Sequence, residues 1–305
     1  EQQVKSWQRI NRRLKAKYNG RAVPEPNDEY FLYQILLGTY PFKNSDPVNF
    51  KQRVQAYIIK AVREAKVHTA WLQPDADYEK GFLEFTTEIL APEQKFLKTF
   101  LPFQQKIAFF GMLNSLSQTV LKMTLPGIPD IYQGCEMWDF SMVDPDNRRP
   151  VDYDLRMRRL QEIKQAGDPP PEDFFNYLLR NSGNGQIKLY LIQRLLQARN
   201  RYAGLFSKAG YQPLEVEGVY RNNLIAFIRT DEKIQMVVLA PRFFTGLVSM
   251  DHYPLGVQTW RETRIEIPGG DWMDMITGRT QEHSAEMKVG KILQLFPTAV
   301  LIREI

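Results

Sequence analysis

Apolar residues in the first 125 positions recur at helical spacing. The first run has apolar side chains three or four positions apart, at Val4, Trp7, Ile10, Leu14 and Tyr18. This spacing places them on one face of an amphipathic helix, which Asn19-Gly20 is expected to end. A second helix is predicted to begin at Asn27, a residue suited to capping, and to bury most of its apolar body.

Three more helices are predicted before residue 125. Asp46-Pro47 is typical of a helix start, with a capping aspartate followed by proline at the first helical position. The apolar positions that follow it form one stripe. Further helical patterns cover residues 78–90 and 103–123.

The pattern changes at Pro126-Gly127, which is expected to end the last of these helices. Residues 128–134 are predicted to form a short buried strand, and helices return at 153–166, 172–181 and 186–202. After Ala203-Gly204 the chain has short segments rich in β-formers and divided by Gly or Pro turns, at 224–229, 234–240, 263–267, 271–276, 292–296 and 298–303. Such segments predict an antiparallel β-sandwich that starts near residue 208.

Composition and charge narrow the class of protein. The 305 residues are 43% hydrophobic, enough for a substantial core, and the net charge of +5 comes from interspersed Lys, Arg, Asp and Glu. We therefore expect a mixed solvated surface and no nucleic-acid partner. No apolar run has the roughly 18 residues needed to cross a membrane. One cysteine, Cys135, fits a reducing cytoplasm. No residue spacing indicates a metal site or a phosphate-binding loop, so no cofactor is expected.

The segment 126–153 combines residue types that bind sugars. Carboxylates and amides can bridge vicinal hydroxyls, arginines can hold those carboxylates, and aromatic rings can cover the apolar face of a pyranose. The segment supplies all three kinds, as Asp130, Tyr132, Gln133, Glu136, Trp138, Phe140, Asp144, Asp146, Asn147, Arg148 and Arg149. The alternative is a surface loop in which the aspartates and arginines pair only with each other.

The order of these residues resembles a known family. Gly127, Pro129, Tyr132, Gly134 and Glu136 follow a pattern that is similar to the eighth barrel strand of the alpha-amylase superfamily. The continuation through Trp138 and residues 144–152 resembles the maltooligosyltrehalose synthases specifically. Residues 27–30, 63–71 and 114–118 share that resemblance, so it extends over nearly the whole chain.

This resemblance implies a reaction and a fold. The reaction is an intramolecular transglycosylation, which turns the reducing-end α-1,4 bond of a maltooligosaccharide into an α,α-1,1 bond with retention. The fold is α+β: a mostly helical region with the remnant of a (β/α)8 barrel, followed by an antiparallel β-sandwich. Residues 1–125 would be a helical insertion between barrel strands 7 and 8. Residues 126–207 would hold the last strand, its loop and the following helices, and residues 208–305 the sandwich.

No catalytic residue is assigned within the chain. In the family the three catalytic carboxylates come from barrel strands 4, 5 and 7, and the strand-7 motif pairs a histidine with the aspartate after it. None of His68, His252 and His283 is followed by aspartate. We therefore expect the chain to begin after that motif, to need an N-terminal barrel portion, and to be inactive alone.

Eight residues are predicted to contact a maltooligosaccharide substrate: Lys66, His68, Trp71, Trp138, Asp144, Asp146, Arg148 and Arg149. Other roles are open for several of them. His68 could be a structural or capping residue, Trp71 could belong to the core, and the two arginines could serve only to hold the aspartates. Glu136 is expected to be a buried structural carboxylate with a donor nearby. Cys135, where the family pattern leads us to expect Thr or Asn, is expected to be a small buried side chain.

Two other functions fit parts of the pattern. The chain could be a non-catalytic protein that binds maltooligosaccharides or acts as a scaffold. It could also belong to another hydrolase of the alpha-amylase superfamily, in which case a longer form would release glucose or maltose.

Overall fold

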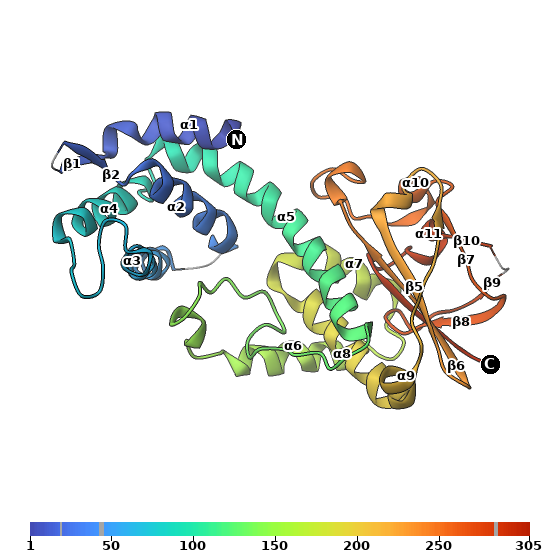
Figure 1. The fold of residues 1–305 in the computed structure, drawn as a ribbon. Helices are drawn as coiled ribbons and strands as arrows, with labels where there is room; N and C mark the ends of the chain where they lie inside the picture. The colour runs from blue at the N-terminus through green and yellow to red at the C-terminus, as the bar shows by residue number, and fades with distance from the viewer. Residues whose placement is uncertain (19, 43–45, 284–285) are drawn as a thin grey trace. The chain divides into compact units, whose positions relative to one another are not determined.

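The computed structural model describes residues 1–18, 20–42, 46–283 and 286–305. By its internal contacts the chain divides into two compact units. The first unit comprises residues 1–108 and 140–150, and the second comprises residues 109–139 and 151–305. Helix α5 (Lys95–Thr124) contributes residues to both (Figure 1). The predicted division into an insertion (1–125), a last barrel strand with its loop and helices (126–207) and a sandwich (208–305) stays a prediction.

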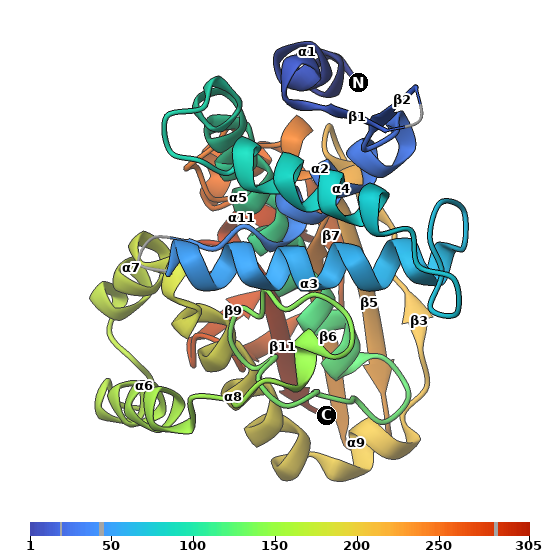
Figure 2. The ribbon, with the colours of Figure 1, turned by 90° about the vertical axis from the view of Figure 1, so that its left-hand side faces the viewer.

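The first unit is built from helices around an aromatic core. Its elements are α1 (Gln2–Asn11), η1 (Arg12–Leu14), the hairpin β1 (Ala16–Tyr18) and β2 (Arg21–Val23), α2 (Pro26–Thr39), α3 (Pro47–Ala65), α4 (Ala76–Ile89) and the start of α5. Trp7 is fully buried, and its ring contacts those of Tyr33, Phe96 and Phe100. Helix α4 packs on α3 (Figure 2). These aromatic contacts give the unit a core of its own.

The helix boundaries in this unit follow the capping residues. Asp46 caps α3 as predicted, because its side chain accepts the Val48 N–H at 2.9 Å. Helix α2 starts at Pro26 rather than Asn27, since proline is already set for the first helical position. Helix α5 starts at Lys95 and continues through Pro102, so the prediction that began it at residue 103 was too short. Proline usually interrupts a helix, but Pro102 lies inside this one.

In the second unit, α6 (Tyr153–Gln165), α7 (Glu172–Arg180) and α8 (Gln186–Arg201) match the predicted helices closely. The structure adds two short helices, η3 (Ser182–Asn184) and α9 (Ala203–Lys208). Helix α8 lies deepest, with Ile187, Leu191, Leu195 and Ala198 all buried. Their spacing of three or four residues puts them on one face, which packs into the core of this unit.

Two antiparallel sheets complete the second unit (Figure 1). The six-stranded sheet has the order β3-β5-β6-β11-β8-β9, and the three-stranded sheet has the order β10-β7-β4. Their bounds are β3 (Gln212–Pro213), β4 (Val216–Glu217), β5 (Leu224–Thr230), β6 (Ile234–Pro241), β7 (Arg264–Glu266), β8 (Gly270–Asp274), β9 (Thr280–His283), β10 (Glu286–Lys288) and β11 (Ala299–Glu304). Short helices lie between strands: η4 (Arg221–Asn223), η5 (Phe244–Gly246), α10 (Gly256–Trp260) and α11 (Val289–Ile292).

Alternate residues of the large sheet enter different cores. Phe227 and Val238 pack with the helices, whereas Ile228 and Val237 share a second core with Ile265 of the small sheet. An α+β fold with antiparallel sheets is therefore confirmed. The strand predicted at 292–296 was wrong, because α11 covers its start and the rest is irregular. A short apolar run does not distinguish a strand from another buried segment.

The predicted strand at residues 128–134 is also absent from the structure, and Ile128 is 96% exposed. A strand needs a partner for its N–H and C=O groups, and no described segment pairs with this one. All described strand pairs are antiparallel, so the barrel remnant is not confirmed. Within the described ranges, no helix combines the length and apolar character needed to cross a membrane.

A buried arginine links helices to the large sheet in the second unit. Arg229 of β5 donates hydrogen bonds to the carbonyl oxygens of Thr124, Phe206 and Ala209, each at 3.1 Å. These carbonyls lie at the C-terminal ends of α5 and α9, where helical backbone acceptors lack partners. Arg199 of α8 donates to the Met123 oxygen at 2.8 Å. The two arginines thereby fix the point at which the chain leaves α5 and enters segment 126–139.

Candidate functional site

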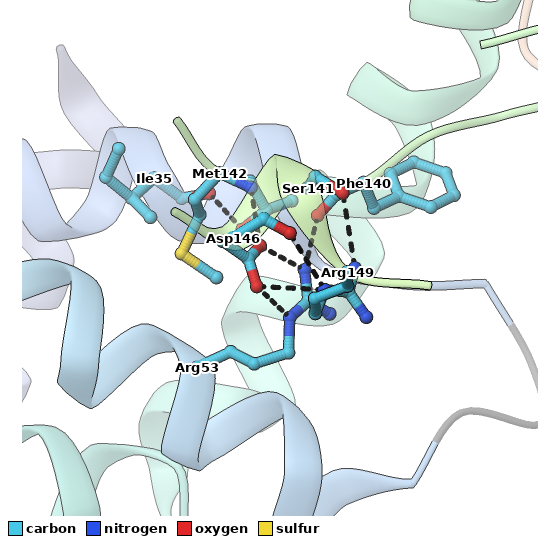
Figure 3. Close-up of polar contacts among 8 residues, drawn as sticks. Ile35, Arg53, Phe140, Ser141, Met142, Asp146 and Arg149 are labelled. Carbon is cyan, nitrogen blue, oxygen red and sulfur yellow. Dashed lines mark hydrogen bonds and ion pairs between the residues drawn. The ribbon is translucent and has the colours of Figure 1, made fainter. Parts of the chain in front are cut away.

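Residues 140–150, here called the Asp-Arg loop, are anchored to α3 by one arginine (Figure 3). Arg53 donates from Nε to Oδ1 of Asp146 at 2.8 Å and from Nη2 to Oδ2 at 2.7 Å. Its Nη2 also donates to the Phe140 oxygen at 2.9 Å. This two-point contact with the carboxylate fixes the loop in orientation as well as in position.

Asp146 is a structural centre of the Asp-Arg loop. Its side chain is only 10% exposed, and it also accepts the Met142 N–H at 2.8 Å and lies 3.0 Å from Arg149 Nε. Burial alone would raise its pKa, but the hydrogen bonds from Arg53 and Met142 and the two arginine charges hold the pKa below its ordinary value. Asp146 is therefore ionised, and both of its carboxylate oxygens accept hydrogen bonds from the protein.

Apolar contacts hold the loop from its other side. Met142 is buried in the core of the first unit, against which Ile35 also packs (Figure 3). The ring of Phe140 meets Phe42 edge to face, with centroids 5.0 Å apart. The start of the loop is thus seated on the helices, and its charged end is held by Arg53.

Asp144 and Arg148 form the exposed end of the Asp-Arg loop. Their side chains are 58% and 64% exposed, and Arg148 Nε lies 2.6 Å from Asp144 Oδ1. Arg149 is half-exposed and donates from Nη2 to the Ser141 hydroxyl at 3.2 Å. These three residues therefore offer a carboxylate and two guanidinium groups to solvent, on a loop that is rigidly attached below.

Trp138 lies in the second unit and is held by its indole N–H. Nε1 donates to the Ser182 oxygen at 2.6 Å, and the Lys188 ammonium lies 5.6 Å from the ring centroid. Gly185 has φ +80°, and a Cβ there would come within 3.0 Å of the Trp138 nitrogen. Burial lowers the pKa of Lys188. The ring is partly open and its orientation is fixed.

Glu136 has the donors that a carboxylate in this position was expected to need. Arg156 of α6 forms an ion pair with it, and the Gly134 N–H donates to it at 3.0 Å. Cys135, next to it, is half-buried, and its thiol lies 3.6 Å from the Asp139 carboxylate. Burial and that negative charge raise the pKa of the thiol. Glu136 and Cys135 thus both contribute contacts that hold segment 126–139 in place.

The remaining three predicted residues lie at the end of α3 and beyond it. Lys66 is the exposed C-cap of the helix, in the left-handed conformation with φ 56°. His68 stacks on Tyr78 at 4.5 Å and places Nε2 3.4 Å from Glu25, an arrangement that suits a structural histidine. Trp71 is exposed, with the Arg63 guanidinium 5.0 Å from its ring centroid.

The structure therefore brings four of the eight predicted residues together, in the Asp-Arg loop. Trp138 belongs to the other unit, and Lys66, His68 and Trp71 form a separate group in the first. No local pattern pointed to Arg53, because it is 93 positions from Asp146 and looks like an ordinary polar residue of a helix. Among the residues described, no three His, Cys, Asp or Glu side chains are grouped so as to hold a metal ion.

Comparison with known proteins identifies one kind of relative. No protein-family model matches the chain. A Mycobacterium tuberculosis protein, provisionally named maltooligosyl trehalose synthase, is 28% identical over 95% of this chain. The solved maltooligosyltrehalose synthase of Arthrobacter ramosus is 26% identical and covers 99% of the chain with a TM-score of 0.74. Another solved maltooligosyl trehalose synthase is 28% identical, covers the whole chain and has a TM-score of 0.72.

The chain spans only part of these proteins. It covers 34% of the M. tuberculosis protein and 35% of each of the two solved structures. The resemblance predicted from the motifs is confirmed: the chain is similar to maltooligosyltrehalose synthases over nearly all of its own length, and it spans about a third of theirs.

Proposed function

We propose that this chain is part of an enzyme that rearranges maltooligosaccharides. In the proposed reaction, the reducing-end α-1,4 bond becomes an α,α-1,1 bond by intramolecular transglycosylation with retention. The observation that carries the proposal is the Asp-Arg loop, which a part-buried Arg53–Asp146 pair holds in place so that Asp144 and Arg148 face solvent. The homology to maltooligosyltrehalose synthases supports the same function.

In this proposal the exposed residues of the loop bind sugar hydroxyls. Asp144 would accept hydrogen bonds from hydroxyl groups, while Arg148 and Arg149 would donate to their oxygens. Asp146 and Arg53 would keep these groups in place without touching the substrate. Rigid placement matters here, because a released glucose must turn and be recaptured before water reaches the glycosyl intermediate. Trp138, in the second unit, is assigned separately as an aromatic surface for sugar, and His68 and Lys66 are assigned to the surroundings of the site in the first unit.

The nucleophile and the general acid are proposed to come from polypeptide that corresponds to the remaining two thirds of the relatives. Within this chain, Glu136 and Asp146 each form an ion pair with an arginine, which suits a structural role. Segment 128–134 would become a barrel strand once a neighbouring strand satisfied its backbone groups. We therefore expect the 305-residue chain to be inactive by itself, since no transition state can be stabilised without the reacting carboxylates.

The test is the loss of reducing ends from maltopentaose. The chain alone is compared with the same chain extended N-terminally to the length of its relatives. Activity is expected only in the extended form, and Asp144→Ala or Arg148→Ala there should lower kcat/KM about 10- to 100-fold. Lys80→Ala, which removes an exposed pair with Glu84 on α4, is the matched control and should change little.

Other results would contradict the proposal. If the chain alone were active, the catalytic residues would lie within it. If the extended form released glucose or maltose without a prior loss of reducing ends, it would be a hydrolase. If it showed no activity but bound the sugar, the non-catalytic alternative would stand.

A further inference from the structure

A tight turn after α3 carries two large apolar side chains at its tip. The Ala70 N–H donates to the Gln73 oxygen at 3.1 Å, and the Gln73 N–H donates back to Ala70 at 3.2 Å. The two residues between them are Trp71, which is 54% exposed, and Leu72, which is fully exposed. Reciprocal hydrogen bonds close the turn, so these side chains are presented to solvent by a fixed backbone. Large apolar groups held in water in this way are typical of a binding surface.

The base of the turn is tied to the helices on both sides. Thr69 is buried, donates from its hydroxyl to Glu79 of α4 at 2.6 Å, and accepts the Asp75 N–H at 2.9 Å. Arg63 of α3 donates to both oxygens of Glu79, at 2.7 and 2.6 Å. The hydrogen bonds from Arg63 hold the pKa of Glu79 below its ordinary value, so this pair stays charged and intact at neutral pH.

The same arginine supports the indole ring. The Arg63 guanidinium lies 5.0 Å from the Trp71 ring centroid, within the range of a cation–π contact. Because Glu79 fixes the plane of the guanidinium, the ring has a rigid backing, while about half of the residue remains open to solvent. A flat, oriented aromatic ring that is half open to solvent suits the apolar face of a pyranose.

We propose that Trp71 is a stacking platform for a glucosyl residue of an α-1,4-linked glucan, and that Arg63 and Glu79 are its positioning residues. The proposal rests on the proposed function for the class of ligand. Arg53, which anchors the Asp-Arg loop, and Arg63 are ten positions apart on α3, about 15 Å at the helical rise. An oligosaccharide of several glucosyl units is long enough to span this separation along the helix axis.

The experiment is a titration of the 305-residue chain with maltoheptaose, followed by calorimetry and by acrylamide quenching of tryptophan fluorescence. Trp7, Trp260 and Trp272 are fully buried, so accessible fluorescence arises mainly from Trp71 and Trp138. Bound sugar should protect this signal. Trp71→Ala should weaken binding about tenfold, and Trp71→Phe, which keeps a flat ring, should recover most of it. Leu72→Ala, in the same turn, is the matched control and should bind like the unaltered chain.

Arg63→Lys separates positioning from stacking. Lysine keeps the charge but cannot hold Glu79 through two parallel hydrogen bonds, so binding should weaken severalfold while Trp71 becomes more accessible to acrylamide. Circular dichroism of each variant shows whether the fold is retained.

Each of the other outcomes would contradict the proposal that Trp71 is a stacking platform. Equal losses in Trp71→Ala and Leu72→Ala would indicate a general apolar contact, as in docking to another polypeptide. Unchanged binding in Trp71→Ala, or no saturable binding by the chain, would also reject it. The proposed function is judged separately, by the reducing-end assay and the Asp144 and Arg148 variants, so either can fail without the other.

Discussion

At the scale of single residues, two aspartates only two positions apart have opposite surroundings. Asp146 is mostly buried and accepts hydrogen bonds from Arg53 and Met142, whereas Asp144 is exposed and forms an ion pair with Arg148. Removing the Asp146 carboxylate from water is unfavourable, and the hydrogen bonds from its charged and backbone donors offset that penalty. The exposed pair contributes little to stability, since water screens it. The first is suited to hold the loop and the second to meet a ligand.

We expect Asp146→Asn to lower the free energy of unfolding of the first unit by about 2 kcal/mol at pH 7. The pKa of Asp146 is lowered in the folded state, so its contribution is present above the unfolded pKa of about 3.9 and is lost as the pH falls through the folded pKa. The penalty should therefore shrink below about pH 4. Urea unfolding at pH 7 and pH 3 measures this difference.

Asp144→Asn provides the comparison for that measurement. Its effect should stay within about 0.5 kcal/mol at both pH values, because the Asp144–Arg148 pair is exposed. Equal effects of the two substitutions would show that Asp146 does not anchor the loop.

At the scale of elements, arginines connect segments that are remote in sequence. Arg53 joins α3 to the Asp-Arg loop, Arg63 joins α3 to α4, and Arg229 joins β5 to the ends of α5 and α9. In the part of the chain that the structure describes, the hydrogen-bond partners of Arg229 are carbonyl oxygens, and burial lowers its pKa. The negative ends of two helix dipoles make such an arrangement tolerable.

Arg229→Met should lower the free energy of unfolding of the second unit by about 3 kcal/mol, because it leaves buried carbonyls without donors. The control is Arg158→Met on the exposed side of α6, expected to change stability by less than about 0.5 kcal/mol. Chemical unfolding followed by circular dichroism gives both values. A loss below about 1 kcal/mol for Arg229→Met would mean that water replaces the arginine at these helix ends.

At the scale of the whole molecule, each of the two units has its own apolar core. Leu36 belongs to the core of the first unit and Leu195 to a core of the second, and both are fully buried. Segment 140–150 returns to the first unit after the chain has entered the second, so the units are not consecutive stretches of sequence. Separate cores favour separate opening reactions.

Leu36→Ala and Leu195→Ala should each cost about 3 kcal/mol, since each leaves a cavity in a packed core. Hydrogen exchange of peptides from both units locates the effect. We expect faster exchange mainly in the unit that carries the substitution, and equal acceleration of both units by either variant would show that they unfold together.

Local patterns in the sequence determined most helices and strands. Residues 153–202 contain three helices whose predicted bounds lie within a residue of the observed ones, because apolar spacing and Gly-Pro breaks act locally. The motifs around residues 126–153 also indicated the resemblance to maltooligosyltrehalose synthases, which the comparisons confirm. Prediction failed where a segment needed a partner or broke a usual rule: residues 128–134 lack a strand to pair with, and α5 continues through Pro102.

Only the tertiary structure decided what each candidate residue does. The sequence pattern placed Asp144, Asp146 and Trp71 in one set of predicted sugar contacts, but folding partly buries one aspartate beside Arg53, exposes the other, and backs the tryptophan with Arg63. These differences depend on contacts between residues far apart in the chain. Periodicity and capping report only the nearest few residues, whereas burial and charge pairing are properties of the packed protein.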